Sequence, residues 1–447
     1  MKPSFYNFTY PFEDGKKVMY NSRSNALALI DDAKYSQFIN YCENATPIED
    51  ESLLRDLKAG AYLVDDDIDE RDLIRLNMLT ARYGTSSLGL TIAPTSDCNF
   101  RCIYCYEKDS IKPVTMSVEV QDKLVEFVEQ RAKMITSLSV AWYGGEPLLA
   151  LDIIESLAKR FKEICEKHEI SYSHSMITNG YLLTPEIAER LKTLQLSMIQ
   201  ITLDGPPEDH DKRRFLKGNI PTFDKIVSNL REIRDNMPCP VSLRINVDRS
   251  NADKVERLLD ILRANELQSS VVPYLGMVES VENTYENSVC YHSNEFSTID
   301  FDFKLRYNND ANNFLATLYP RPVRNVCGAD STTGFVIDAD GKLYKCWNEI
   351  GMEERCAGSL MEAIDGNKRM LLDYILYDPT YDDECKECKF LPICMGGCPS
   401  RRLHRNDNRC EKIKYRMDDY MKVLPSLLKR QQESSRAKLE QTGSVHN

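Results

Sequence analysis

The sequence has 447 residues, of which 42% are apolar and 28% are charged, as in ordinary soluble proteins. Its net charge of −12 argues against general nucleic-acid binding, because phosphate contacts need a basic surface. No apolar run approaches the roughly 20 residues of a membrane span, and the first residues lack the pattern of a signal peptide. We therefore expect a cytoplasmic protein that binds neither nucleic acid nor membrane.

Cysteine is the unusual residue type. The chain has 15 cysteines, and eight of them lie between Cys327 and Cys410. Without an export signal, disulfides are not expected, and clustered cysteines indicate metal or redox chemistry.

Residues 1–85 are predicted to form a separate small α+β domain. Aromatic residues alternate from Tyr6 to Phe12, and Asp14-Gly15 offers a hairpin turn. Helices are predicted over 31–42, 51–58 and 70–83, with a short strand over 60–64. A hairpin followed by helices resembles a winged helix–turn–helix.

Residues 86–280 alternate strand and helix. Strands are expected over 88–93, 138–142, 172–177, 198–203, 241–247 and 270–274. Helices are expected over 117–132, 151–168, from 184, over 222–236 and over 252–264. Six strands with helices between them indicate an α/β fold with a parallel sheet or partial (β/α)6 barrel, whose functional residues follow the strands.

The last third of the chain is predicted in three parts. Residues 281–324 form a helical linker, residues 325–412 form a Cys-rich domain, and residues 413–447 form a helix to Gln432 with a disordered tail. Asp338 to Gly341 is expected to be a hairpin turn, because it has too few carboxylates for a calcium loop.

Three cysteines follow the first predicted barrel strand, with the spacing Cys98-x3-Cys102-x2-Cys105. Three thiolates on one short loop can hold three irons of a [4Fe–4S] cluster, and the fourth iron stays open to chelate an amine and a carboxylate. The plainer alternative is a zinc or structural site.

This loop resembles the hallmark of the radical S-adenosylmethionine (radical SAM) superfamily, including the aromatic Tyr104 before the third cysteine. Gly144, Gly145, Glu146 and Pro147 resemble the GGEP motif of the family, which holds the amino group of SAM. The resemblance implies SAM and a [4Fe–4S] cluster as cofactors. By the same resemblance, further residues line the SAM pocket: Ser175, Thr178, Asn179, Asp204, Arg213, Arg244 and Asn246.

The second cysteine group resembles the SPASM extension, which holds two auxiliary [4Fe–4S] clusters, three clusters in all. By that resemblance one cluster is ligated by Cys385, Cys388, Cys394 and Cys410. The other is ligated by Cys327, Cys346 and Cys398. Cys356 or a substrate cysteine would complete the second set, and the alternative for Cys356 is plain packing.

The resemblance implies an enzyme that cleaves SAM reductively to a 5′-deoxyadenosyl radical, which takes a hydrogen from a peptide. Trp347 stands where sulfatase-maturating relatives have an acidic base, and the N-terminal domain resembles a leader-peptide recognition domain. The sequence is therefore similar to sactipeptide and ranthipeptide maturases, which form Cys thioether crosslinks. The expected partners are a ribosomally made, Cys-containing precursor peptide with a leader and an electron donor of flavodoxin or ferredoxin type.

Other functions stay open. A different SPASM-type enzyme could mature a sulfatase or form carbon–carbon crosslinks. Outside enzymes, the alternatives are a multi-cluster electron carrier and a zinc-bound interaction scaffold.

Overall fold

The computed structural model describes residues 1–307, 319–362, 368–404 and 409–443. The chain divides into two compact units. The terminal unit comprises Met1–Ala81, His292–Val326 and Asp378–Asn447, and the barrel unit comprises Arg82–Tyr291 and Cys327–Tyr377. The predicted Cys-rich segment 325–412 therefore contributes to both units, and its assignment as one functional domain stays a prediction.

The six strands predicted for the barrel are confirmed, and they pair in parallel in chain order. They are β6 Ser87–Ile92, β7 Ser137–Trp142, β8 Ser171–Thr178, β9 Met198–Thr202, β10 Val241–Val247 and β11 Val271–Met277. Buried apolar side chains alternate along β6 with half-exposed ones, so one face packs on helices and the other stays accessible. The fold is the predicted open α/β barrel.

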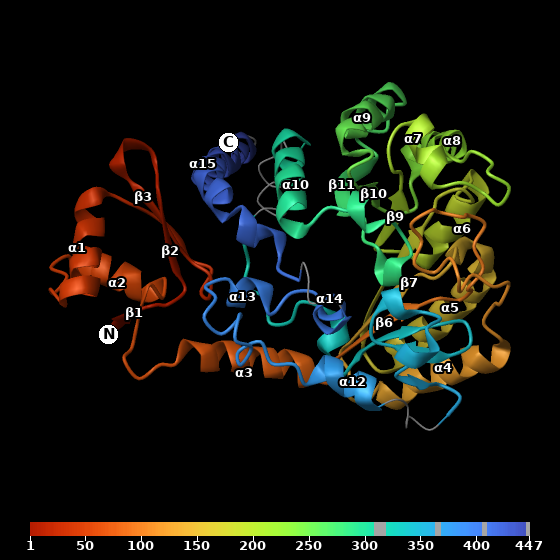
Figure 1. Cartoon of the computed structure of the whole chain (residues 1–447), viewed down its shortest axis with the longest axis horizontal. Helices are drawn as coiled ribbons and strands as arrows, with labels where there is room; N and C mark the ends of the chain where they lie inside the picture. The colour runs from red at the N-terminus through yellow and green to blue at the C-terminus, as the bar shows by residue number, and fades with distance from the viewer. Residues whose placement is uncertain (308–318, 363–367, 405–408, 444–447) are drawn as a thin grey trace. The chain divides into compact units, whose positions relative to one another are not determined.

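Helices connect the strands and lie on the outer side of the sheet in Figure 1. They are α4 Val118–Arg131, α5 Leu151–Lys167, α6 Pro185–Leu194, α7 Pro207–Arg213, α8 Phe223–Ile233 and α9 Val255–Ala264. Two of these helices have side-chain caps: the Ser117 side chain accepts a bond from the Val120 amide, and the Thr184 side chain accepts one from the Ile187 amide. Each cap satisfies an amide that the first helical turn leaves unpaired.

The sheet continues beyond β6 with strands from the last third of the chain. β12 (Gly334–Ile337) pairs in parallel with β6, and β13 (Lys342–Tyr344) and β14 (Gly358–Ser359) follow antiparallel. The turn between β12 and β13 is the one predicted at Asp338–Gly341, and Gly341 has a φ of +81°. Helix α12 (Lys368–Ile375) also belongs to this unit.

The segment Met1–Ala81 of the terminal unit contains strands and helices, as predicted, and its assignment as a separate domain over residues 1–85 stays a prediction. A short ladder joins β1 (Lys2–Pro3) to β5 (Leu63–Val64), and a three-stranded antiparallel sheet has the order β2-β3-β4. Its strands are β2 Asn7–Pro11, β3 Lys17–Asn21 and β4 Leu27–Ile30, and its helices are α1 Asp32–Asn44, α2 Glu51–Ala59 and α3 Glu70–Tyr83. Strand β4 was not expected from the sequence.

The C-terminal part of the terminal unit is helical. Its helices are α10 Ser293–Tyr307, α13 Leu391–Cys394, α14 Pro399–His404 and α15 Met417–Gly443. Buried side chains of α15, among them Met421 and Leu424, share an apolar cluster with Val18 and Tyr20 of β3. This cluster fixes the C-terminal helix on the N-terminal sheet.

The prediction of a disordered tail from residue 433 is wrong as far as Gly443, where α15 ends. Residues 433–443 are rich in good helix formers such as Ala, Lys, Glu and Leu, and they extend a helix already anchored by packing. Residues 444–447 lie outside the described part of the chain. Within that part, no helix has the length and hydropathy needed to cross a membrane.

Candidate functional site

The cysteine loop follows β6 directly in the barrel unit. Burial raises the pKa of all three thiols, to about 12 for Cys105. A cluster or metal binds thiolates, so its binding here must displace protons from Cys98, Cys102 and Cys105. In the described residues, no three His, Cys, Asp or Glu side chains converge as ligands of one ion would. A [4Fe–4S] cube spreads its thiolates over separate irons, and the ligand assignments stay predictions.

One flank of the cysteine loop is held by the backbone of residues 213–217. The Arg101 amide donates to the Phe215 carbonyl at 2.7 Å, and the Ile103 amide donates to the Arg213 carbonyl at 3.0 Å. Phe100 and Leu216 form a β-bridge between these bonds. The loop is therefore paired like an edge strand, although it carries no strand pattern in the sequence.

The other flank is held by the glycine turn after β7. The Glu146 amide donates to the Asp97 carbonyl at 2.9 Å, and the Gly145 amide donates to the Thr95 carbonyl at 3.3 Å. A Cβ on Gly145 would lie 2.1 Å from the Asp97 carbonyl oxygen, and Gly144 has a φ of +101°. Both positions require glycine, one for close approach and one for conformation.

The Glu146 side chain joins the ends of two strands. It is buried, and its Oε1 accepts bonds from Thr178 Oγ1 at 2.6 Å and the Leu148 amide at 3.0 Å. Its Oε2 accepts from the Asn179 amide at 2.8 Å. Burial raises the pKa of Glu146, while these bonds lower it. Because both carboxylate oxygens are engaged, Glu146 fixes the turn, and Pro147 begins the 3-10 turn Pro147–Ala150 that follows.

Tyr104 is the centre of a buried hydrogen-bond network. Its hydroxyl donates to Asp204 Oδ2 at 2.6 Å and accepts from Arg214 Nη1 at 2.9 Å and Asn246 Nδ2 at 3.1 Å. Burial raises the pKa of Tyr104. The network joins the cysteine loop to the ends of β9 and β10, so Asp204 and Asn246 lie beside Tyr104, and their contact with SAM stays a prediction.

Three other predicted SAM-contact residues lie within elements: Arg213 ends helix α7, Ser175 lies in the middle of β8, and Arg244 lies in the middle of β10. Arg213 donates to Asp204 at 3.2 Å and to Asp248 at 2.6 Å, so it is already paired with two carboxylates. The strand register places Ser175 of β8 and Arg244 of β10 on one face of the sheet.

Asn179 bonds a residue that the sequence reasoning missed. Its Nδ2 donates to Asn99 Oδ1 at 2.7 Å. Asn99 lies inside the Cys98–Cys102 spacing, which was the only signal for it. Arg214, next to Arg213, was missed in the same way.

Four buried polar atoms in this region have no hydrogen-bond partner among the described residues: Asn99 Nδ2, Asp204 Oδ1, Arg213 Nη2 and Arg214 Nε. Buried polar atoms are costly unless they are paired. Three of these atoms are hydrogen-bond donors and one is a carboxylate oxygen, so they suit a ligand that has acceptors such as a carboxylate and donors such as an amine. A ligand with an amine, a carboxylate and ribose hydroxyls, such as SAM, fits that set.

Residues 92–262 match the radical SAM superfamily. The chain contains a radical SAM domain. Such a domain holds SAM and a [4Fe–4S] cluster, which together supply a 5′-deoxyadenosyl radical. In this radical SAM domain the cysteine loop follows β6 and the glycine turn follows β7, and the assignment of individual residues to the cofactors stays a prediction.

Similar proteins extend beyond this domain. The Cys-type anaerobic sulfatase-maturating enzyme of Clostridium novyi is 25% identical, with 73% of this chain and 94% of the relative aligned. The structure of anSMEcpe with bound AdoMet and Kp18Cys peptide superposes with a TM-score of 0.59 at 21% identity, covering 77% of this chain and 98% of that one. Streptococcus suis SuiB bound to the precursor peptide SuiA superposes with a TM-score of 0.53 at 14% identity, covering 92% and 98%.

The second cysteine group is partly assembled in the terminal unit. Cys394 and Cys410 lie close enough for their thiols to interact, and this interaction lowers the pKa of Cys410 and raises that of Cys394. Lys414 Nζ lies 3.5 Å from Cys410 Sγ and also interacts electrostatically with Cys388. Cys385 shares a tight turn with Cys388, whose amide donates to the Cys385 carbonyl at 3.0 Å. The assignment of these four cysteines to one cluster stays a prediction.

The second predicted auxiliary set is divided between the units. Cys327 and Cys346 belong to the barrel unit, and Cys398 belongs to the terminal unit, so this set stays a prediction. Cys356 packs against the apolar cluster that includes Tyr344, and its thiol donates to the Gly358 carbonyl at 3.1 Å. That environment supports the packing role for Cys356.

Replacement of Cys98, Cys102 and Cys105 by Ala should abolish reductive SAM cleavage, because all three proposed ligands of the SAM cluster are removed. The measurement is 5′-deoxyadenosine formed anaerobically by reduced, reconstituted protein. Iron that remains in the variant reports the other cysteine groups. Normal 5′-deoxyadenosine formation by the triple variant would contradict the assignment.

Gly145→Ala should lower the melting temperature and the iron bound by the cysteine loop, because the new Cβ meets the Asp97 carbonyl. We expect the free energy of unfolding to fall by roughly 2 kcal/mol or more, as for other substitutions that force the backbone to shift. Gly89→Ala is the matched control, since its Cβ would meet only Ser139 Oγ at 4.0 Å. Equal melting temperatures and iron contents of the two variants would show that the contact at Gly145 is unimportant.

Proposed function

We propose that the chain is a radical SAM peptide maturase that forms a Cys thioether crosslink in a ribosomally made precursor peptide. The observation that carries the proposal is the radical SAM site together with the additional N-terminal α+β domain. The superposition on SuiB, which is bound to a precursor peptide, covers 92% of this chain, whereas that on anSMEcpe covers 77%. The larger coverage supports a shared N-terminal region that recognises the leader.

The residue after Cys346 separates this proposal from sulfatase maturation. Trp347 is 42% exposed, and its ring stacks on Tyr143 with centroids 5.6 Å apart. Tyr143 directly follows β7, and its hydroxyl is bonded to that of Tyr106 in the cysteine loop. An indole at this place offers an apolar surface to a peptide and cannot act as the acidic base of the sulfatase-maturating enzymes.

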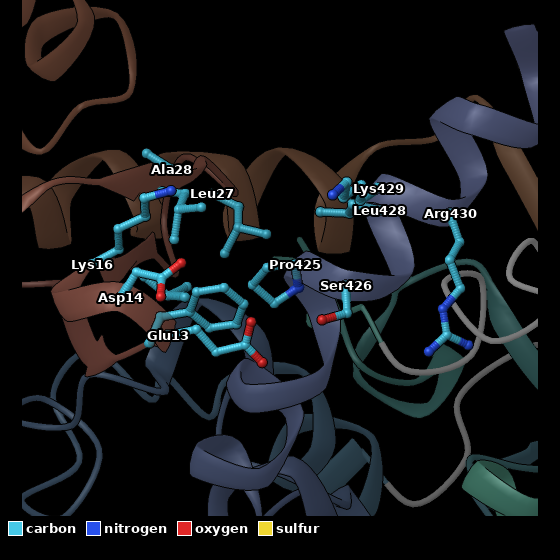
Figure 2. A pocket seen from close by; sticks show the side chains of 13 residues that line it. Glu13, Asp14, Lys16, Leu27, Ala28, Pro425, Ser426, Leu428, Lys429 and Arg430 are labelled. Carbon is cyan, nitrogen blue, oxygen red and sulfur yellow. The ribbon is translucent and has the colours of Figure 1, made fainter.

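A cavity of about 620 Å³ in the terminal unit is a candidate place for the leader peptide (Figure 2). Its wall includes Leu27 and Leu29 of the edge strand β4, and Leu29 is 49% exposed. Glu13 lines the hairpin side, and Arg430 lines the α15 side. An unpaired strand edge beside apolar side chains can bind an extended peptide by adding a strand.

Three [4Fe–4S] clusters belong to the proposal, one in the radical SAM domain and two held by the second cysteine group. Thioether formation removes two hydrogen atoms from the peptide. The 5′-deoxyadenosyl radical would take one as a hydrogen atom, the cysteine thiol would lose the other as a proton, and an auxiliary cluster held by the second cysteine group would accept the remaining electron. An external flavodoxin or ferredoxin supplies the electron that starts SAM cleavage.

Sulfatase maturation is the second candidate function, favoured by the 25% identity with the Clostridium novyi enzyme over 94% of its length. It requires a base that this chain does not carry at position 347. The two functions differ in their products. In a thioether crosslink the cysteine sulfur is bonded to a carbon of another residue and is no longer a free thiol. In sulfatase maturation the cysteine is oxidised to the level of an aldehyde.

Incubation with SAM, reductant and the peptide from a Cys-containing reading frame beside the gene should remove two hydrogen atoms from the peptide and protect one cysteine from alkylation. Tandem mass spectrometry locates the crosslink, and a hydrazine probe detects any aldehyde. A hydrazine-reactive product without a crosslink would establish the second candidate function.

Leu29→Glu should weaken leader binding at least tenfold, because the bound leader would bury a carboxylate that is half exposed in the free protein, and burying an unpaired charge is costly. Fluorescence anisotropy of a labelled synthetic leader of that peptide measures the affinity. Leu305→Glu on α10 is the control, since Leu305 is 38% exposed and does not line the cavity. Equal affinity of the Leu29 variant and the wild type would place the leader elsewhere.

A further inference from the structure

The outer edge of the cysteine loop reaches the protein surface. Ile103 stands between Cys102 and Cys105, two of the proposed cluster ligands, and its side chain is 39% exposed. The segment that pairs with the loop turns back as a hairpin, in which Leu216 forms a β-bridge with Ile220, and Ile220 is 53% exposed. The loop and its hairpin therefore present apolar side chains to solvent close to the thiols.

Basic residues flank this edge. Residues 212–221 contain four basic residues and no acidic one, in a chain whose net charge is −12. Two of the four are buried arginines, and the other two, Lys212 and Lys217, are exposed. The Lys217 amide donates to the Asn99 carbonyl at 3.3 Å, and the carbonyl of the residue after Lys212 accepts from the Ile103 amide at 3.0 Å. The two lysines therefore lie at the two ends of the paired segments.

Arg101 adds a positive charge on the loop itself. Its Nη1 donates to the Cys98 and Phe100 carbonyls, both at 2.6 Å, so its guanidinium lies against the loop backbone. The acidic residue nearest to the hairpin in sequence is Asp211, and its Oδ1 already accepts bonds from two amides at the start of α8.

These positive charges are uncompensated. Within the described part of the chain, neither Arg101 nor the two exposed lysines form an ion pair. Together with the exposed apolar side chains they make a surface that we name the basic edge: Arg101, Ile103, Lys212, Lys217 and Ile220.

The electron that starts SAM cleavage must reach the cysteine loop from outside the protein. Electron transfer through protein slows steeply with distance, so the donor has to dock beside this loop. The Tyr104 side of the loop is filled by the buried polar network, whereas the basic edge is open to solvent. Electron-transfer complexes bury little surface, and an apolar centre with a polar rim is the usual anatomy of a protein interface.

We propose that the basic edge is the docking surface for a small acidic electron-transfer protein of the flavodoxin type. Most of the surface of a chain with net charge −12 repels an acidic partner. A local group of uncompensated cations therefore directs this partner to one place and raises the rate of encounter.

The docked donor passes one electron to the cluster held by the cysteine loop. Its anionic flavin hydroquinone becomes the neutral semiquinone, the oxidised cluster takes up the electron, and no proton moves. The inference rests on the external donor of the proposed function and is independent of the peptide reaction.

The test compares two double variants that change the net charge equally. Lys212→Glu with Lys217→Glu reverses the charge of the basic edge. Lys133→Glu with Lys159→Glu is the control, because these lysines are also exposed and belong to the same unit. The probe is a purified flavodoxin. Isothermal titration calorimetry measures the affinity of its oxidised form, and stopped-flow absorbance measures how fast its hydroquinone reduces the reconstituted full-length protein.

We expect the basic-edge variant to bind flavodoxin about tenfold more weakly, and to be reduced by it about tenfold more slowly, than the control variant at low salt. High salt should shrink the difference, because it screens the charges. Excess dithionite is a small reductant that needs no docking surface, so it should reduce both variants to the same extent and support equal 5′-deoxyadenosine formation.

Equal affinities and equal reduction rates of the two variants with flavodoxin would overturn the proposal, and so would a wild-type rate that does not fall with salt. A basic-edge variant that dithionite also fails to reduce would show that the lysines stabilise the loop and would overturn the docking role. The milder pair Lys212→Gln with Lys217→Gln, which only removes the charges, should show a smaller defect of the same kind. Failure of the wild type with dithionite would contradict the radical SAM site itself, and no result here depends on the thioether reaction because no peptide is present.

Discussion

An irregular loop that must hold three thiols in fixed positions is the constraint on which the rest of the barrel unit depends. Such a loop loses conformational entropy without the repeated bonds of a helix or strand, and its buried amides and carbonyls need partners. Here the partners come from two sides. The glycine turn bonds residues 95–97, and residues 213–217 bond residues 99–103. The loop is thus fixed before any cofactor binds.

The same constraint explains where the buried charges lie. Glu146 uses both carboxylate oxygens to join the ends of β7 and β8, and Asp204 uses one oxygen for Tyr104 and Arg213. These charges sit in a polar network that orients backbone and side chains toward the strand ends. Preorganised polar groups of this kind need little rearrangement when a ligand arrives.

The parts of the fold that were predictable from the sequence are those with local signals. Short strand segments alternating with helical ones located all six barrel strands, and Ser117 and Thr184 marked helix starts because their side chains bond amides of the first helical turn. The cysteine spacing and the glycine turn are also local signals, and they predicted the position of the site. Arg214 and Asn99 could not be found this way, since their roles depend on contacts with residues distant in sequence. Strand β4 was missed because only its pairing with β3 defines it.

The last third of the chain shows how such non-local pairing changes domain boundaries. By sequence, residues 325–412 form one Cys-rich segment, but strand β12 pairs with β6 along Gly334–Ile337. If an edge strand has no partner, it exposes a row of backbone amides and carbonyls. β12 covers that edge at the strand that leads into the cysteine loop. Residues of the Cys-rich segment are thus part of the barrel itself, so a barrel cut at residue 291 would lack the strand that protects β6.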